Sequence, residues 1–368
     1  MKERKICYFN RSAIHYRKNI YQLMDKELPC DFYFGDSRPG KIKTISYYIL
    51  SHFKGEFHNV NIGPFYWQKG ALKLLRSDYT DIITPGEPEC LSTWLLILFA
   101  KWYHKNIYTW THGAYGKESA LRRVIERWKI KHLKGCFLYG EYAKGILKQW
   151  GVPEDKLYVI YNSLSYDEQY PFRNSMNDSS FFRDHFENDN KNIVFIGRLT
   201  KVKKLNQILE AVSFLQKQSL SFNITFVGEG SEKQNLELLA TEFALEKQVW
   251  FYGACYDENQ ISKFLYNADL CVSPGNVGLT AMHAMSFGCP VISHNNFKMQ
   301  MPEFEAIEPG KTGDFFKEDD VQDLANVIKR WSIANVNRES VRQACYKVID
   351  EKYNPHIQIE TIKSAINK

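Results

Sequence analysis

The sequence contains no apolar run long enough to cross a membrane. Its longest run, Trp94 to Ala100, is far shorter than the roughly 20 residues that a spanning helix needs, so it predicts a buried core helix. The basic N-terminus leads into a short strand within a few residues and lacks the apolar stretch of a secretory signal. These absences predict a cytoplasmic protein without a transmembrane segment.

Paired cysteines are also absent. The sequence has eight cysteines and no CxxC pair, and most of the cysteines lie inside apolar strand or helix patterns. This distribution is typical of reduced core thiols in a cytosolic protein. The cysteines therefore predict neither a disulfide framework nor an oxidising compartment.

Basic charge is concentrated in the first half of the chain. Residues 1–150 hold 25 Lys and Arg against 13 Asp and Glu, a net +12, and residues 151–368 carry a net −6. Such asymmetry commonly marks a surface that meets an anionic membrane, an anionic small molecule or nucleic acid. Nucleic acid is disfavoured, because the basic residues are not interleaved with stacking aromatics and no standard signature is present.

Short apolar runs alternate with helical patterns, which predicts α/β domains with parallel, doubly wound sheets. The length of 368 residues exceeds what one core usually supports, so two domains are expected. We predict a first domain over residues 1–165, an Asn-, Asp- and Ser-rich linker over 166–191 and a second domain over 192–335. Residues 336–368 are predicted to be helical, and in two-domain folds of this kind such a segment can pack back on the first domain.

The stretch from Ser273 to Val291 predicts an anion-binding site. It places a turn containing Gly275, Asn276 and Gly278 between an apolar strand and an Ala- and Met-rich helix. The first N–H groups of a helix have no intrahelical partner and the helix dipole is positive there, so a phosphate can bind without a dedicated side chain. A purely structural strand–turn–helix connection has the same pattern. This stretch alone therefore does not distinguish an anion site from a structural connection.

Other loops of the second domain are predicted to converge on the same point. Glycine-containing loops follow the strands that end at Gly197, Gly228 and Gly253, and ligands bind at the carboxyl ends of strands in an open parallel sheet. Arg198 and Lys203 follow the first of these strands at a spacing suited to a diphosphate. A solvated basic loop is the alternative, and the convergence favours a ligand site.

Four segments in this order resemble the donor-nucleotide domain of glycogen-synthase-like glycosyltransferases. They are GRLTKVKKLNQILEA, VGEGSEKQNLELLA, VWFYG and the stretch from Ser273 to Val291. Residues 151–163 resemble the strand and Asn that close the acceptor domain of that family. The resemblance covers most of residues 135–335 and implies the GT-B fold, in which two Rossmann-like domains face each other across a cleft.

The resemblance implies a retaining glycosyltransferase that uses a nucleotide-diphosphate sugar, either a UDP- or a GDP-sugar. Its diphosphate would bind the two cations and the first N–H groups of the helix, which replace a metal ion on the leaving group, and the base would lie near residues 251–253. The expected donor-binding residues are Arg198, Lys203, Gly228, Phe251, Gly253, Gly275, Asn276, Gly278, Leu279, Thr280 and His283. No further cofactor is implied.

Two glutamates of the family pattern are missing. Members typically carry them eight positions apart, one touching the donor sugar and one the ribose, but this sequence has Gly275 and His283 there. His283 offers a ring nitrogen to the ribose, with a structural histidine as the alternative. We predict that Glu303 or Glu305, in a Pro-bounded loop, reaches the sugar instead. The loss also leaves open a catalytically silent module that binds a sugar nucleotide or a glycan.

The first domain is predicted to bind the acceptor, a glycan or a lipid-linked sugar in cell-surface polysaccharide or lipopolysaccharide synthesis. His112 follows a buried strand and is a candidate catalytic residue, because imidazole suits proton transfer near neutral pH. A structural histidine is the alternative. Two further strand-end loops supply the candidate acceptor-binding residues Asn10, Arg11, His15, Arg17, Glu87 and Glu89.

The segment from Ala120 to Gly135 predicts a basic amphipathic helix. It contains seven Lys, Arg and His residues between and beside apolar positions, including Trp128. Such a helix can lie on an anionic membrane, and a core-facing helix with a solvated basic face is the alternative. The pattern fits a peripheral enzyme at the inner face of the cell membrane.

Overall fold

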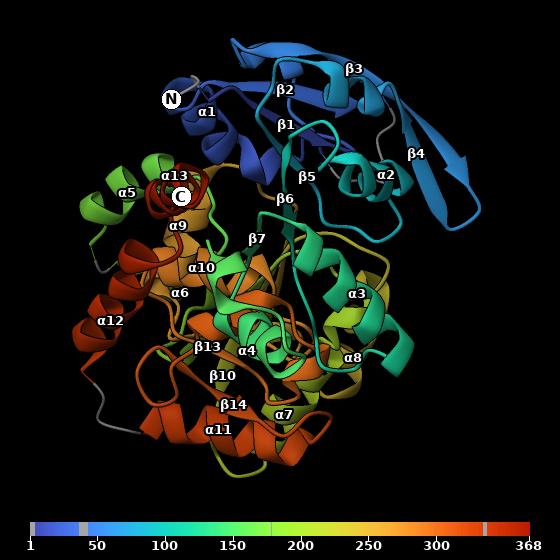
Figure 1. Ribbon diagram of the computed structural model, residues 1–368. Coiled ribbons are helices and arrows are strands. Elements are labelled where there is room, and N and C mark those ends of the chain that lie inside the picture. The colour runs from blue at the N-terminus through green and yellow to red at the C-terminus, as the bar shows by residue number, and fades with distance from the viewer. Residues whose placement is uncertain (1–3, 37–42, 178, 334–336) are drawn as a thin grey trace. The chain divides into compact units, whose positions relative to one another are not determined.

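The computed structural model describes residues 4–36, 43–177, 179–333 and 337–368. The chain divides into two compact units, one formed by Met1–Ser165 and Tyr353–Lys368 and the other by Tyr166–Lys352. Each unit is built around its own β-sheet (Figure 1). The predicted boundary between residues 335 and 336 lies outside the described residues.

The first unit contains an eight-stranded sheet. Its strands are β1 (Ile6–Asn10), β2 (Cys30–Gly35), β3 (Phe53–Ile62), β4 (Phe65–Lys69), β5 (Asp81–Pro85), β6 (Asn106–Thr111), β7 (Gly135–Leu138) and β8 (Leu157–Val159). They lie in the order β4-β3-β2-β1-β5-β6-β7-β8, and β3 with β4 is the antiparallel pair of this otherwise parallel sheet. The strand order reverses between β1 and β5, so the loops after these strands leave neighbouring strand ends.

Helices cover both faces of this sheet. They are α1 (Lys18–Glu27), α2 (Leu91–Phe99), α3 (Ala120–His132), α4 (Glu141–Gln149) and the C-terminal α13 (Pro355–Asn367). Side chains alternate between the faces of a strand. Accordingly, Ile6 and Tyr8 of β1 join the core beneath α1 and α13, whereas Cys7 and Phe9 join the core beneath α2 and α4.

The second unit contains a six-stranded parallel sheet. Its strands are β9 (Lys191–Ile196), β10 (Phe222–Val227), β11 (Val249–Gly253), β12 (Leu270–Ser273), β13 (Val291–His294) and β14 (Gly313–Phe316), in the order β11-β10-β9-β12-β13-β14. Its main helices are α7 (Asn206–Gln216), α8 (Lys233–Glu242), α9 (Glu258–Asn267), α10 (Leu279–Ser286), α11 (Val321–Ile333) and α12 (Arg338–Glu351). The strand order reverses between β9 and β12. Together the two sheets confirm the predicted fold class.

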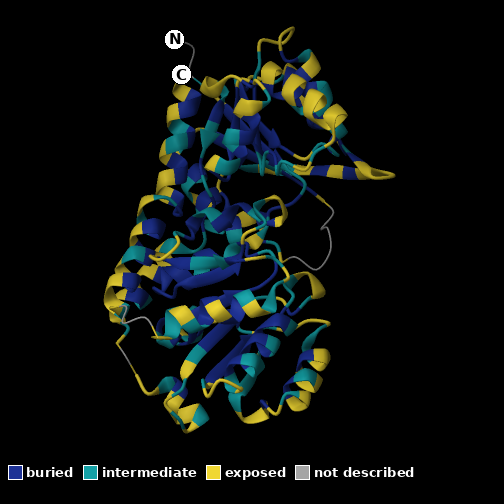
Figure 2. Ribbon diagram, turned by 90° about the horizontal axis from the view of Figure 1, so that it is seen from below, coloured by how far each residue is buried: buried dark blue, intermediate teal, exposed yellow. Residues whose placement is uncertain are grey.

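Burial separates the sheets from their surroundings. Most strand residues of both sheets are buried, and exposed residues gather on helices and loops (Figure 2). The β3–β4 hairpin is an exception, because many of its side chains are exposed. None of the described helices is long and apolar enough to cross a bilayer.

Three parts of the structure differ from the expected secondary structure. The β3–β4 hairpin was not expected, because its polar, exposed sequence gives no apolar run. Residues 166–191, expected as a linker, contain α5 (Tyr166–Ser175) and α6 (Phe181–Phe186), which both pack on α9. The ion pair of Arg173 with Asp350, at 2.9 Å, stabilises α5 from outside the segment. The C-terminal region forms two helices, because Asn354 caps α13 and Pro355 occupies its first turn.

Candidate functional site

The topological switch point of the second sheet joins two of the predicted loops. Lys203, in the loop after β9, donates hydrogen bonds from Nζ to the backbone oxygen of Asn276 at 2.5 Å and to its Oδ1 at 3.0 Å. The backbone N–H of Gly275 donates in return to the carbonyl oxygen of Lys203 at 2.9 Å. These bonds hold the loop after β9 against the loop after β12. Ligands bind at such switch points in doubly wound sheets.

Close packing at Gly275 explains why this position has no side chain. A Cβ atom there would lie 2.0 Å from the carbonyl oxygen of Val202 and 2.7 Å from Cα of Lys203. Both neighbours are backbone atoms and cannot turn away as a flexible side chain could. The loop after β9 therefore occupies the space into which a glutamate at position 275 would have to project.

Gln300 fixes the loop after β12 from the other side. This buried side chain accepts a hydrogen bond from the backbone N–H of Val277 at 2.8 Å. Its Nε2 donates to Ser293 Oγ at 2.8 Å and to the carbonyl oxygen of His294 at 2.9 Å. Sequence reasoning missed Gln300, because its partners lie on other elements. The only sequence feature that pointed to Gln300 was its position three residues before the predicted Glu303.

The start of α10 has the glycine turn and helix start that the sequence predicted. Gly278, the N-cap residue, has φ 52° and ψ −148°, a conformation that glycine adopts and other residues avoid. The N–H groups of Leu279 and Thr280 begin the helix, where no intrahelical acceptor is available. The Thr280 hydroxyl is engaged within the protein, because it donates to the carbonyl oxygen of Ile196 at 3.0 Å.

Three charged residues share the neighbourhood of this helix start. Burial lowers the pKa of Lys203 to about 8, nearby Glu303 raises it, and nearby Arg198 lowers it. Arg198 is exposed, whereas Glu303 is buried in a 3-10 helix, Pro302–Ala306, that packs on α10. Glu305 lies in the same short helix and is half-buried. The structure thus brings Arg198, Lys203 and Glu303 together.

His283 is held by a carboxylate from a neighbouring helix. Its Nε2 lies 3.0 Å from Oε2 of Glu258, and Nε2 of Gln169 donates to the same oxygen at 3.3 Å. One ring nitrogen of His283 is therefore engaged within the protein. Sequence reasoning did not find Glu258, which begins α9 and is 25 residues from His283 along the chain.

The remaining predicted donor residues lie along the strand ends of the same sheet. The ring of Phe251 stacks on Phe226 with 5.2 Å between centroids and is partly buried against the core of this unit. At Gly228, a Cβ atom would lie 1.8 Å from the carbonyl oxygen of Gly197, so the two strands approach closely. Gly253 ends β11 with φ 93°.

The first unit has a cavity of about 220 Å³ at its own switch point. The loops after β1, β5 and β6 all contribute to its lining. Five predicted residues line it, namely Asn10, Arg17, Glu87, Glu89 and His112. Arg11 is not among the lining residues, because its guanidinium donates to Asn61 at 3.1 Å and lies over the ring of Tyr66. His15 does not line the cavity either.

His112 is neutral at physiological pH. Burial lowers the pKa of His112 to about 4, and the nearby Arg17 guanidinium lowers it as well. The imidazole ring lies 4.8 Å, between centroids, from the ring of Tyr139. A neutral imidazole can accept a proton or a hydrogen bond, although a pKa of about 4 makes it a weaker base than an ordinary histidine, and its catalytic role stays a prediction.

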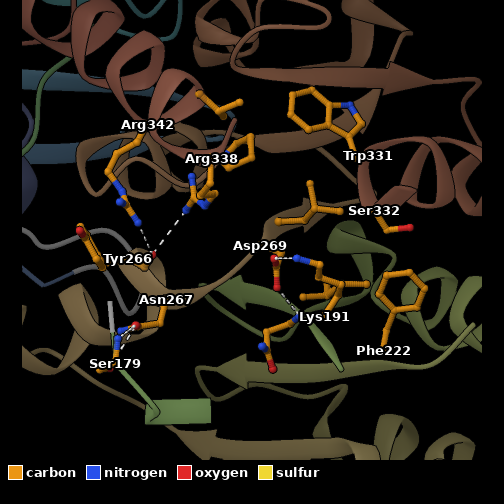
Figure 3. Close-up of a pocket in the computed structure, with 15 residues that line it drawn as sticks. Ser179, Lys191, Phe222, Tyr266, Asn267, Asp269, Trp331, Ser332, Arg338 and Arg342 are labelled. Carbon is orange, nitrogen blue, oxygen red and sulfur yellow. Dashed lines mark hydrogen bonds and ion pairs between the residues drawn. The ribbon is translucent and has the colours of Figure 1, made fainter. Parts of the chain in front are cut away.

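Another pocket, of about 290 Å³, lies at the opposite, amino-terminal edge of the second sheet (Figure 3). Its polar side chains are engaged in the fold. Arg338 and Arg342 both donate to the carbonyl oxygen of Tyr266 (Figure 3). Arg338 also donates to the carbonyl oxygen of Ala268. Cations at the ends of helices stabilise free carbonyl groups. The two arginines therefore have a structural role.

The amphipathic helix α3 exposes its apolar residues. Leu121 and Val124 are 71% and 65% exposed, and Ile125 and Trp128 are also exposed. The alternative of a core-facing helix therefore does not describe these four side chains. Basic residues Arg122, Arg123, Arg127 and Lys131 lie on the same helix.

Comparison with known proteins found relatives that match different shares of this chain. It is 28% identical over 155 residues to an uncharacterized glycosyltransferase of Methanocaldococcus jannaschii, a match that spans 39% of this chain and 37% of that protein. It is 26% identical over 185 residues to the amylovoran biosynthesis glycosyltransferase AmsK of Erwinia amylovora, spanning 48% of this chain and 44% of AmsK. An uncharacterized 41.2 kDa protein in the cps region of Klebsiella pneumoniae is 23% identical, covering 86% of this chain and 80% of that protein.

Solved structures share the whole fold. Anabaena Alr3699/HepE in complex with UDP matches with a TM-score of 0.74 and 15% identity, covering 99% of each chain. The lipopolysaccharide outer core galactosyltransferase WaaB matches with a TM-score of 0.71 and 15% identity, covering 98% of this chain and 99% of WaaB. Residues 177–348 match the family model "Glycosyl transferases group 1". The family match assigns residues 177–348 to the group 1 glycosyltransferases, and the solved structures show that the chain as a whole has the GT-B fold.

Proposed function

We propose that this enzyme transfers a sugar from a UDP- or GDP-sugar to a glycan or lipid-linked acceptor in cell-surface polysaccharide or lipopolysaccharide synthesis. AmsK acts in amylovoran biosynthesis, and WaaB is a lipopolysaccharide galactosyltransferase. The Klebsiella relative lies in a cps region. Retention of the anomeric configuration is proposed from the family resemblance.

One observation carries the donor part of this proposal, namely Lys203 held at the switch point beside the start of α10. The ammonium group is fixed by two oxygens of Asn276 and lies close to Arg198. A diphosphate would accept hydrogen bonds from both cations and from the N–H groups of Leu279 and Thr280. These groups would stabilise the negative charge of the leaving diphosphate, so we propose that transfer needs no metal ion.

Glu303 is proposed as the carboxylate that contacts the donor sugar. It is buried, and its charge acts on Lys203, which lies beside the expected phosphate position. Position 275 has no room for the family glutamate, so a carboxylate from the neighbouring segment takes over its role. Glu303→Gln should reduce turnover and retain nucleotide binding. Glu305→Gln is the matched comparison, since Glu305 lies in the same short helix; equal rates in both variants and the wild type would contradict the role of Glu303.

In the first unit, His112 is proposed to act on the acceptor hydroxyl. A neutral imidazole in a cavity with three carboxylates can take up or relay the hydroxyl proton. His112→Ala should abolish transfer and leave the nucleotide Kd largely unchanged. Transfer at the wild-type rate in this variant would remove His112 from the mechanism.

The donor site is tested by thermal shift and calorimetry with a panel of sugar nucleotides, because a ligand that binds only the native state raises its stability. We expect one UDP- or GDP-sugar to bind the wild type and to bind Lys203→Met at least tenfold more weakly. Lys201→Met is the matched control, because Lys201 lies in the same loop and is exposed. Equal affinity in all three proteins would refute the site.

A catalytically silent module is the second candidate, favoured by the missing glutamates at Gly275 and His283. Donor turnover separates the two functions. Tight nucleotide binding with neither hydrolysis nor transfer, on any mixture of glycan and lipid acceptors, would favour the silent module. Release of nucleotide diphosphate that depends on an acceptor would establish the enzyme.

Helix α3 is proposed to bind an anionic membrane. Its exposed Leu121 and Val124 can enter the interface, and its arginines match a negatively charged surface. The protein should co-sediment with vesicles containing phosphatidylglycerol and not with pure phosphatidylcholine. The double variant Leu121→Ser, Val124→Ser should lose this binding and keep donor affinity. Unchanged co-sedimentation of the variant would contradict this surface.

A further inference from the structure

Arg17 is a buried cation without a carboxylate partner. It is 8% exposed and lies in a short 3-10 helix, His15–Arg17, directly before α1. Its guanidinium donates a hydrogen bond to the hydroxyl of Tyr139 and lies over the rings of Trp110 and Tyr139, at 5.2 and 5.5 Å from their centroids. Within the described part of the chain, no carboxylate lies within ion-pair distance of Arg17.

These contacts do not compensate the burial of a full positive charge. A buried guanidinium is normally retained because a carboxylate or phosphate oxygen balances it. The neutral Tyr139 hydroxyl and two aromatic faces position the group without neutralising it. The Nε atom of Arg17 is buried and has no hydrogen-bond partner among the described residues. The site therefore contains an unused donor and an unbalanced charge.

The cavity beside Arg17 is open to a ligand and is not uniformly positive. Its lining carries two guanidinium groups, Arg17 and Arg122, and three carboxylates, Glu87, Glu89 and Glu126, beside His112 and Tyr139, in a volume of about 220 Å³. The Arg17 guanidinium can bind an oxyanion, and the three carboxylates can accept hydrogen bonds from sugar hydroxyls. His112 adds no further positive charge because it is neutral, so the cations in this lining are Arg17 and Arg122.

We infer that this cavity binds an oxyanion of the acceptor through Arg17, so that the acceptor carries a carboxylate or a phosphate next to the sugar that is extended. The inference rests on the proposed function, in which the first unit binds the acceptor. The planar guanidinium suits either group, because carboxylate and phosphate both present two oxygens to its fork. A uronic acid of a polysaccharide and the phosphate of a lipid-linked sugar are the two sources of this chemistry.

The preference is tested by isothermal titration calorimetry on the full-length protein. The probes are methyl glucuronide, inorganic phosphate and the uncharged methyl glucoside, each titrated in the presence of saturating UDP or GDP so that the donor site is filled. We expect at least one anion to bind at least tenfold more tightly than methyl glucoside. A preference for glucuronide would identify a uronic acid, and a preference for phosphate would identify a phosphate-linked acceptor.

Arg17→Gln should weaken the preferred anion at least tenfold and leave the Kd of the nucleotide unchanged. Lys18→Gln is the matched control, because it removes a neighbouring charge that does not line the cavity. Arg17→Lys covers the case in which the Gln variant does not fold, and it should bind the anion with intermediate affinity. The comparison of charged and uncharged probes on the wild type tests the inference even if no Arg17 variant folds.

Three results would overturn the inference. They are equal binding of the charged and uncharged probes, unchanged anion affinity in Arg17→Gln, and loss of all anion binding once the nucleotide is bound. The last result would assign Arg17 to the donor. Failure of the proposed function is recognised separately, because no nucleotide would then bind to the wild type. The probes would in that case be titrated against Lys203→Met, in which the proposed donor cation is absent. Any anion binding that remains would still test Arg17.

Discussion

Gly275 offers a sharp test of how the proposed donor site departs from the family pattern. The perturbation adds a side chain, first as Gly275→Ala and then as Gly275→Glu, which restores the residue that the family pattern carries. In both variants the new Cβ atom meets the Val202 carbonyl oxygen at 2.0 Å and Cα of Lys203 at 2.7 Å. Contacts below 3.0 Å require the backbone to move.

The cost follows from overpacking and from the hydrogen bonds of the two loops. Overpacking a close-packed site costs about 1–3 kcal/mol. Separation of the loops also weakens the bonds between Gly275 and Lys203 and between Lys203 and Asn276, which contribute about 1 kcal/mol each. The free energy of unfolding should therefore fall by about 2–4 kcal/mol. Nucleotide affinity should fall at least tenfold, because Lys203 leaves its position.

Urea unfolding and nucleotide calorimetry measure these two quantities. Gly145→Ala is the control, since this glycine lies inside α4 and a Cβ atom added to it would meet no neighbouring atom within 4 Å, so alanine should stabilise the helix by about 0.5–1 kcal/mol. The two glycine substitutions thus have opposite expected signs. A Gly275→Ala protein with wild-type stability and affinity would refute the packing argument. A Gly275→Glu protein with increased turnover would show that the family glutamate fits.

The remaining predictions concern two titrating groups and one buried amide. The pKa of Lys203 is about 8, so nucleotide affinity should fall as pH rises through 8, and Lys203→Met should lose this dependence while Lys201→Met keeps it. His112 has a pKa of about 4 against 6.5 in the unfolded chain, so between these values the unfolded state binds more protons. Stability should therefore fall by up to about 3 kcal/mol as pH falls from 6.5 to 4, and His112→Gln should remove that loss; equal pH profiles of unfolding would contradict it. Gln300→Ala should cost about 2–4 kcal/mol in urea unfolding and weaken nucleotide binding, because it leaves the Val277 N–H without its acceptor; an effect below 0.5 kcal/mol would show that the loop does not depend on it.

The sequence predicted the parts of the fold that local patterns encode. The strand before Gly197 and the strand before Pro274 are short apolar runs followed by glycine and polar residues, and both end at the switch point of the second sheet. The association of Arg198 and Lys203 with the start of α10 was expected for the same reason. It follows from topology, since parallel strands present their carboxyl ends at one edge.

Features that depend on distant partners could not be predicted. Helix α5 contains Pro171 and is held by the ion pair between Arg173 and Asp350, which are separated by 177 residues. The bond between His283 and Glu258 and the three hydrogen bonds of Gln300 likewise join separate elements. A single sequence carries no local signal for such pairs. The absent glutamate at position 275 was visible, but its cause, a backbone at 2.0 Å, required coordinates.

The two sheets position their cations by the same physical means. Lys203 and Arg17 each lie in the loop after the strand at which a sheet reverses its order. Each is held by neutral oxygens, those of Asn276 for Lys203 and of Tyr139 for Arg17. A carboxylate in the same place would orient the cation equally well, but it would also satisfy the charge and repel an anionic ligand. Neutral acceptors restrain the cation and leave its charge available, which is what a site for phosphate or carboxylate requires.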